Sequence, residues 1–257
     1  MKLKFTILGC GSSMGVPRTD GYWGKCNPKE KKNFRTRCSA LISSLNKNIL
    51  IDTSPDLRSQ LLKNKIKRIN DVIYTHYHAD QTHGINDLRV FYLTQKKKIN
   101  IYADVITYKY LKNNFTYCFK GIKGYPATLD LKKINKKIII KDNNFNININ
   151  SIKIRHGYID ALGYIINKKC AYISDVNEIY KKDYKNLLNL KFLIIDCLKE
   201  NYHPSHYNLS SILEIVKIIK PTKTILTNLH TDLDYNYLKK ILPKNITPAY
   251  DGMYFYF

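Results

Sequence analysis

Residues 76–81 read His-Tyr-His-Ala-Asp-Gln and directly follow an apolar run at residues 72–75. The apolar run predicts a buried strand, and two histidines two residues apart on extended backbone point to the same side. Asp80 follows where the chain turns toward a helix. Imidazole and carboxylate are typical ligands of zinc, iron and manganese, and α/β proteins place their chemistry at the carboxyl ends of strands. The segment therefore predicts a metal site at a strand end of an α/β fold.

Apolar runs separated by turn residues predict alternating strands and helices along the chain. The predicted strands are residues 2–8, 39–44, 48–52, 72–75, 99–102, 137–140, 146–149, 151–155, 162–166, 171–174, 192–195 and 224–227. The predicted helices are residues 55–63 (opened by Pro55, with Ser54 as N-cap), 84–95, 104–117, 209–220 and 235–241. Because no linker or composition break interrupts this pattern, we expect one domain over residues 1–257.

Composition is that of a globular protein, with 44% hydrophobic residues over 257 positions. No window is long and apolar enough to span a membrane, and the first residues run into a strand without a signal peptide. The six cysteines are scattered and form no C-x-x-C pair. We therefore expect no disulfide framework, no membrane partner and a cytoplasmic location.

The formal net charge is +23, yet only seven of the 43 basic residues are arginine. A basic surface can attract a phosphate-rich partner. Alternatively, abundant Lys, Asn, Ile and Tyr reflect a compositional bias that leaves a solvated lysine surface. We favour the second interpretation for the total charge, which remains compatible with an anionic substrate. Because arginine is scarce, Arg18, Arg58 and Arg89 are candidates for phosphate contacts.

Three further ligand-type residues follow predicted strands. His156 follows residues 151–155, Asp175 follows residues 171–174, and His230 lies just after the strand that ends at Thr227. A single polar residue at a strand end is usually a cap or a turn residue. Four such positions at successive strand ends, including residues 76–81, favour one shared metal site.

Several motifs together resemble a known superfamily. Thr75-His76-Tyr77-His78-Ala79-Asp80, the strand end Ile51-Asp52-Thr53, and the later His156 and Asp175 are similar to the metallo-β-lactamase superfamily. The glycine-rich turn at residues 8–17, the segment 84–89 and Tyr250-Asp251-Gly252-Met253 resemble its branch containing phosphoribosyl cyclic phosphodiesterase. The resemblance implies a four-layer αββα sandwich with two metals in the crevice between its sheets.

The resemblance also implies roles for particular residues. It assigns the first metal to His76, His78, His156 and Asp175. It assigns Asp80 and Asp175 to the second metal, with Asp175 bridging the two ions. Asp52 would support the site without binding an ion.

Two positions depart from the superfamily pattern, because Gln81 and Asn228 stand where histidines of the second metal site are usual. Amide oxygens are harder and weaker ligands, better suited to manganese or magnesium than to zinc. His230 would share the side of Asn228 if the strand continued, and could replace it as a ligand. The cofactor is therefore expected to be one or two divalent ions, Zn or Mn.

The phosphodiesterase branch also carries a structural zinc held by closely spaced cysteines. Here the corresponding loop holds only Cys26, with Cys38 twelve residues later. We expect no structural zinc, and we expect Trp23 and neighbouring polar groups to hold this loop instead.

The expected chemistry is attack by a metal-bound hydroxide on a phosphodiester. Asp80 can orient this nucleophile. His206, in His203-Pro204-Ser205-His206, matches the general-acid histidine of the branch and can protonate the leaving group. For His203 we favour capping or surface polarity, and for His83 a supporting structural role.

The sequence thus predicts a metal-dependent phosphodiesterase whose partner is a small, cyclic or nucleotide-like phosphate; it leaves a homodimer open. One alternative is a tRNA 3′-processing endoribonuclease, for which residues 122–150 are the only candidate for a protruding basic arm. Nucleic acid is therefore not the favoured partner. The other alternative is a non-catalytic metal-binding protein with a degraded second site, as Gln81 and Asn228 would allow.

Overall fold

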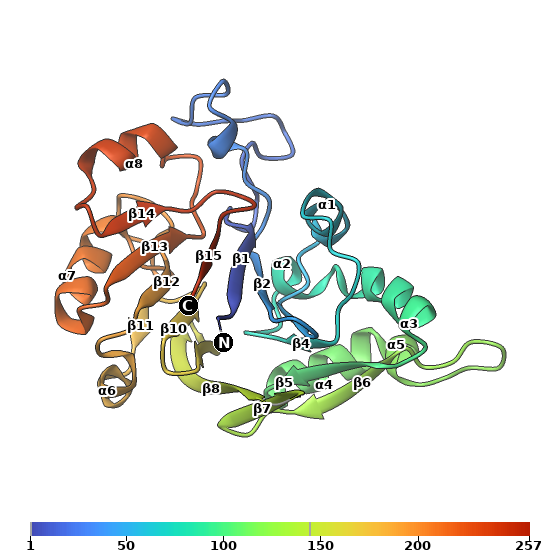
Figure 1. The fold of residues 1–257 in the computed structure, drawn as a ribbon. Coiled ribbons are helices and arrows are strands. Elements are labelled where there is room, and N and C mark those ends of the chain that lie inside the picture. Colours follow the sequence, from blue (N-terminus) through green and yellow to red (C-terminus); the bar gives the residue numbers. More distant parts are fainter. Residues whose placement is uncertain (1, 144) are drawn as a thin grey trace.

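Two mixed β-sheets lie face to face in the centre of the molecule, with helices on their outer faces (Figure 1). The structure is a computed structural model and describes residues 2–143 and 145–257. Three separate apolar cores fill the spaces between the four layers. The fold is the predicted αββα sandwich.

The first sheet has the strand order β15-β1-β2-β3-β4-β5-β6. Its strands are β1 (Lys4–Gly9), β2 (Ser39–Ser43), β3 (Asn48–Ile51), β4 (Asp71–Ile73), β5 (Ile99–Ala103), β6 (Leu129–Lys133) and β15 (Tyr254–Tyr256). The strands from β15 to β3 pair antiparallel, whereas β3, β4, β5 and β6 run parallel. The carboxyl ends of the parallel strands therefore share one edge.

The second sheet has the order β11-β8-β9-β10-β12-β13-β14, and β7 also pairs with β8. Its strands are β7 (Lys137–Asp142), β8 (Phe145–His156), β9 (Ile159–Ile166), β10 (Cys170–Ile173), β11 (Glu178–Ile179), β12 (Phe192–Asp196), β13 (Lys223–Thr227) and β14 (Ile246–Pro248). The strands β10, β12, β13 and β14 are parallel. This sheet thus has its own shared edge of carboxyl ends.

Side-chain alternation along the strands builds two cores at once. In β3, Ile49 and Ile51 lie in the core between the sheets, whereas Leu50 lies in the core under the outer helices. Successive side chains of a strand point to opposite faces, so a strand covered on both sides has no polar face. The inter-sheet core is completed from the second sheet by residues such as Tyr164 and Tyr172.

Helices cover both outer faces. On the first sheet these are α1 (Leu57–Lys63), α2 (Ala79–Thr82), α3 (Arg89–Gln95), α4 (Val105–Asn114) and α5 (Thr116–Phe119), with the 3₁₀ turn η2 (Ile85–Leu88). On the second sheet these are α6 (Tyr184–Leu187), α7 (Leu209–Ile219) and α8 (Tyr235–Ile241), with η3 (Lys181–Asp183); η1 (Lys31–Asn33) lies in a loop. The buried residues of α7 recur at helical spacing and form its sheet-facing stripe: Ile212, Ile215, Val216 and Ile219.

Several predicted boundaries differ from the structure. Residues 146–149 and 151–155 belong to the single long strand β8, which pairs continuously with its neighbours through Asn150 and Ser151. The helix expected from Pro55 begins at Leu57, because Pro55 and Asp56 form a turn in which Ser54 Oγ accepts the Asp56 N–H. The short strands β6, β11, β14 and β15 were not predicted.

The loop before β2 is held by a buried arginine. The Arg35 guanidinium donates to Asn33 Oδ1 at 3.0 Å and to the carbonyls of Leu233 at 2.7 Å and His230 at 3.3 Å. Asn33 in turn donates to Asp234 Oδ2 at 2.6 Å. Arg35 and Asn33 therefore tie this loop to the segment after β13, whereas the prediction was that Trp23 and neighbouring polar groups hold it.

All six cysteines are free and buried. Within residues 2–143 and 145–257, no helix has the length and apolar character needed to cross a membrane.

Most of residues 122–150 form β6, β7 and β8 rather than an arm. The short loop between α5 and β6 protrudes from the sheet (Figure 1).

Candidate metal centre

The predicted ligand residues meet where the carboxyl ends of strands from both sheets face each other. His76 and His78 follow β4, His156 is the last residue of β8, and Asp175 follows β10. The two sheets contribute together, so residues 99 positions apart in the sequence, His76 and Asp175, share one crevice. The strand-end pattern of the sequence thus brings these four side chains together.

Three imidazoles form the centre of the site. One ring nitrogen of each of His76, His78 and His156 lies within 4.8 Å of the others. His76 Nε2 and His78 Nδ1 lie 2.9 Å apart, and the ring of His156 lies 5.1 Å from both rings between centroids. Nitrogen ligands at such spacing could hold one divalent ion.

Hydrogen bonds fix the tautomers of two of these rings. His156 Nδ1 donates to the Ser205 carbonyl at 2.8 Å, which leaves the lone pair on Nε2. Thr75 Oγ1 donates to Asp52 Oδ2 at 2.8 Å and lies 3.0 Å from His76 Nδ1, so it accepts the proton of that nitrogen. Asp52 therefore orients His76 through Thr75, and the His76 lone pair also lies on Nε2.

Burial keeps the imidazoles of His76 and His78 neutral. It lowers the pKa of His76 to about 3 and lowers the pKa of His78 below its ordinary value. A neutral imidazole at neutral pH offers a free lone pair, which is the form that metal ligation requires. The donor set and its tautomers therefore fit a divalent metal ion.

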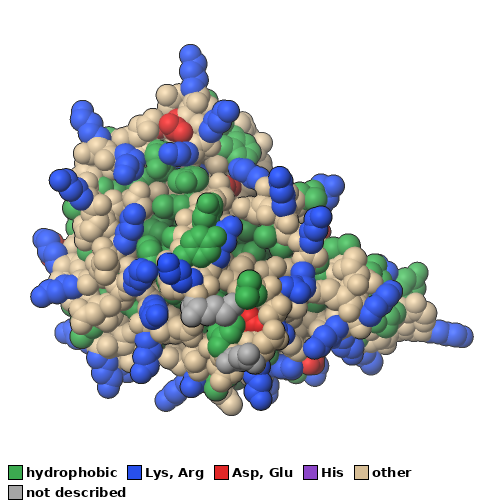
Figure 2. Space-filling model, in the orientation of Figure 1, with side chains coloured by type: hydrophobic (Ala, Val, Ile, Leu, Met, Phe, Trp, Pro, Cys, Tyr) green, Lys and Arg blue, Asp and Glu red, His purple; other side chains and the backbone are tan. Residues whose placement is uncertain are grey.

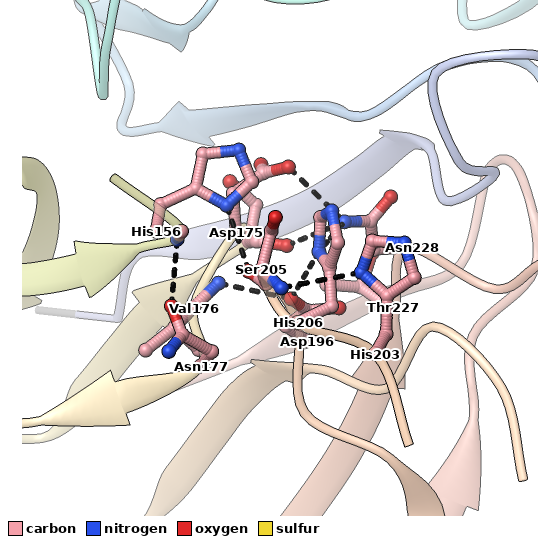
Figure 3. A network of polar contacts seen from close by, with 12 residues as sticks. His156, Asp175, Val176, Asn177, Asp196, His203, Ser205, His206, Thr227 and Asn228 are labelled. Atoms are coloured by element: carbon pink, nitrogen blue, oxygen red, sulfur yellow. Dashed lines mark hydrogen bonds and ion pairs between the residues drawn. The ribbon is translucent and has the colours of Figure 1, made fainter. Parts of the chain in front are cut away.

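Asp175 joins a second cluster with His156 and His206, whose ligand atoms also lie within 4.8 Å of one another (Figure 3). Burial acts to raise the pKa of Asp175. The imidazoles of His76, His156 and His206 outweigh burial and hold this pKa below its usual range. The site therefore contains a buried, ionised carboxylate beside the three imidazoles.

His206 forms an ion pair with Asp196, a residue that the sequence analysis missed. His206 Nδ1 lies 2.7 Å from Asp196 Oδ2, and Asp196 is fully buried (Figure 3). Burial lowers the pKa of His206, but Asp196 overcomes it and the pKa rises to about 9. Burial raises the pKa of Asp196 to about 6. Between these values His206 is cationic and Asp196 anionic.

Asp80 lies outside both clusters and contacts Gln81, whose Nε2 donates to Asp80 Oδ2 at 3.0 Å. Burial, with the Asp175 charge as the next cause, raises the pKa of Asp80 to about 6. A half-buried carboxylate with this pKa can hold or release a proton near neutral pH.

The structure does not bring His230 to the site. Strand β13 ends at Thr227, and Asn228 has a φ of 60°, so the chain turns before His230. His230 Nδ1 lies 3.5 Å from Asp232 Oδ1, and His230 belongs to neither ligand cluster of the described residues. The expectation that His230 replaces Asn228 as a ligand assumed a continued strand, which the structure contradicts.

The remaining candidates have other partners. Arg18 Nε donates to Asp20 at 3.1 Å, Arg89 stacks 5.9 Å from the ring centre of Tyr125, and Arg58 lines a cavity of about 580 Å³ between α1 and α3.

The ring nitrogen of His83 lies 3.2 Å from the Tyr110 hydroxyl, and His203 Nδ1 accepts the Ser205 N–H at 3.3 Å. Neither histidine belongs to a ligand cluster of the described residues.

Comparison with known proteins identifies the family. A model described as "Beta-lactamase superfamily domain" matches residues 47–228. The chain belongs to the beta-lactamase superfamily. It therefore shares the fold of the superfamily, which implies a divalent metal, as the sequence resemblance predicted.

Several solved structures share the fold of this chain over nearly its whole length. A diphosphatase of the PhnP family is 29% identical, with a TM-score of 0.91 and coverage of 100% of this chain and 98% of that chain. Zn²⁺-bound PqqB from Methylobacterium extorquens is 15% identical, with a TM-score of 0.81 and coverage of 98% and 99%. Human tRNase Z, short form, is 17% identical, with a TM-score of 0.68 and coverage of 98% of each.

One curated relative is an octanoyltransferase of Porphyromonas gingivalis (strain ATCC BAA-308 / W83), 30% identical over 255 residues. The match covers 98% of this chain but 51% of the relative. The chain thus spans about half the length of that protein, whose name describes the larger chain.

Proposed function

We propose that this superfamily member hydrolyses small phosphodiesters at a divalent ion held by His76, His78, His156 and Asp175. The observation that carries the proposal is the convergence of three imidazoles and one ionised carboxylate beside a cationic His206. We propose Zn or Mn as the ion, because both accept imidazole and carboxylate together.

The chemistry requires a nucleophile, a cation that stabilises the negative charge of the phosphoryl group, and a proton donor. A divalent ion bound here would polarise the phosphoryl group and make a water molecule reactive at neutral pH. The imidazolium of His206 can then donate a proton to the leaving alkoxide. Asp196 keeps His206 protonated and fixes its ring through Nδ1, so that Nε2 carries the proton that is transferred. Asp80 can orient the attacking water and accept its proton.

The substrate class follows from charge and from the relatives. A phosphodiester is a small monoanion, which suits a crevice that offers one bound cation and one imidazolium. The similar PhnP-family protein is named a diphosphatase, so diphosphate linkages belong to the class to be tested. We further propose that the described residues act as one catalytic domain, because both sheets contribute ligands.

Nucleic acid is the weaker candidate. The tRNase Z structure is 17% identical, a likeness that shows the fold alone. The Lys and Arg side chains are dispersed over the face shown in Figure 2 rather than gathered in one patch. This dispersal is the pattern expected of a lysine-rich composition.

The test is turnover by metal-loaded protein on a panel of bis(p-nitrophenyl) phosphate, 2′,3′-cyclic nucleotides, a dinucleoside diphosphate and p-nitrophenyl phosphate. We expect hydrolysis of one or more of the diester-type substrates and little of the monoester. His156→Ala removes a proposed metal ligand. It should lower turnover by about 100-fold or more, the usual cost of losing a group on which the chemical step depends. His83→Ala is the matched control and should keep full activity. A preference for the monoester, or full activity of His156→Ala, would reject the proposal.

A further inference from the structure

The superfamily pattern supplies a second ion with Asp80, Asp175 and two histidines, and this chain has Gln81 and Asn228 at the histidine positions. Both amide side chains are buried, at 0% and 2% exposure. Their location beside Asp80 and Asp175 raises the question of what occupies the second ion position.

Gln81 directs its amino group at both carboxylates. Its Nε2 donates to Asp80 Oδ2 at 3.0 Å and to Asp175 Oδ2 at 3.4 Å. Its Oε1 has no donor among the described residues, so the carboxylates alone set the orientation of this amide. The backbone of Gln81 is also fixed, because its carbonyl accepts the Thr53 N–H at 2.7 Å.

Asn228, which follows a strand of the second sheet, also directs its amino group at Asp175 (Figure 3). Its Nδ2 donates to Asp175 Oδ1 at 3.1 Å and to the Ser174 carbonyl at 2.9 Å. If this amide turned over, its oxygen would lie against the Ser174 carbonyl oxygen, which is repulsive. Asn228 is therefore locked with its amino group toward Asp175.

An amide nitrogen has no lone pair available for a metal, so these two amino groups are not ligands. An ion between Asp80 and Asp175 would have to displace them. We propose that the carboxamides of Gln81 and Asn228 take the place of the second divalent ion, and that this chain holds a single ion. Hydrogen bonds from both amides stabilise the charge of Asp175, one to each oxygen.

This inference rests on the ion site of the proposed function, but its first test does not depend on turnover. Metal-stripped protein is loaded with Zn²⁺ or Mn²⁺, passed through a desalting column, and analysed for metal per chain. We expect one ion per chain for the wild type. Two ions retained with similar affinity would overturn the proposal.

Variants then test whether the two amides exclude the second ion. The double variant Gln81→His with Asn228→His restores two imidazoles and should approach two ions per chain. Gln95→His is the control, because Gln95 donates to the Ile69 carbonyl at the opposite end of β4. It should stay at one ion.

Gln81→Glu covers the case in which the double variant does not fold. This isosteric change places a third carboxylate beside Asp80 and Asp175, and a bound cation relieves the repulsion that would otherwise keep one carboxyl protonated. We expect a second ion to bind and the unfolding temperature to depend more steeply on metal than in the wild type. Folded variants that all remain at one ion would show that these amides do not exclude the second ion.

The two proposals fail separately. One bound ion without turnover of any phosphodiester would contradict the proposed function and leave the single-ion site standing. Turnover of phosphodiesters by a chain that retains two ions would contradict the single-ion site and leave the proposed function standing.

Discussion

At the scale of single residues, the pair of His206 and Asp196 explains how an imidazole in this crevice remains charged at neutral pH. The buried Asp196 carboxylate raises the pKa of His206 to about 9 against the opposing effect of burial. Without such a partner, an imidazole in this crevice would be neutral, as His76 is.

We therefore expect turnover of diesters with poor leaving groups to fall as the pH rises through about 9, because His206 then loses the proton that it donates. His206→Gln should remove this pH limb and slow poor leaving groups by about 100-fold or more, the usual range for general acids. Aryl substrates such as bis(p-nitrophenyl) phosphate should lose much less. Equal losses on both substrate types would contradict the donor role.

Sequence reasoning reached those site residues that follow a recognisable strand. His76, His78, His156 and Asp175 all end or follow predicted strands. Asp196 obeys the same rule at the end of β12 and could have been found by it. The position of His230 could not, because it depends on the left-handed backbone at Asn228. Nor does a sequence state which end of an amide faces a carboxylate.

At the scale of elements, Gly84 sets how closely the histidine motif packs on the first sheet. A Cβ at this position would lie 2.0 Å from the Ser54 carbonyl oxygen and 2.9 Å from Leu57 Cβ. The Gly84 N–H also donates to the Thr53 carbonyl at 2.9 Å. The turn after α2 therefore has no room for a side chain.

Gly84→Ala should lower the free energy of unfolding by about 1–3 kcal/mol, the usual cost of overpacking. Because α2 carries Asp80 and Gln81, the same variant should also bind metal more weakly. Denaturant unfolding and metal titration measure both effects. Gly121→Ala is the control, since its Cβ would meet no atom closer than 3.4 Å. If Gly84→Ala were as stable as the wild type, the backbone near Ser54 would have to move aside at no cost in free energy, which would contradict the tight packing proposed here.

Most elements were predictable because strands covered on both faces are apolar throughout, as in β3 and β12. The missed strands are short or lie at sheet edges. β6 carries exposed lysines, and β15 is three residues long and exists by pairing with β1. Such strands are specified by tertiary contacts rather than by their own pattern.

At the scale of the whole molecule, the candidate metal centre joins the two halves of the sandwich. His76 and His78 come from the first sheet, and His156 and Asp175 come from the second. An ion bound by all four would link the sheets, so binding should stabilise the fold. The basic side chains behind the net charge of +23 are dispersed over the face shown in Figure 2.

The most direct test of the account is a divalent-metal titration of stripped wild-type protein and of His76→Ala, followed by unfolding temperature and by phosphodiester turnover. In the wild type, we expect both to rise together, with stabilisation of about 2.7 kcal/mol once free metal exceeds its Kd a hundredfold. His76→Ala should gain neither. Full turnover by the stripped wild type, or equal stabilisation of the variant, would contradict a metal centre built on these histidines.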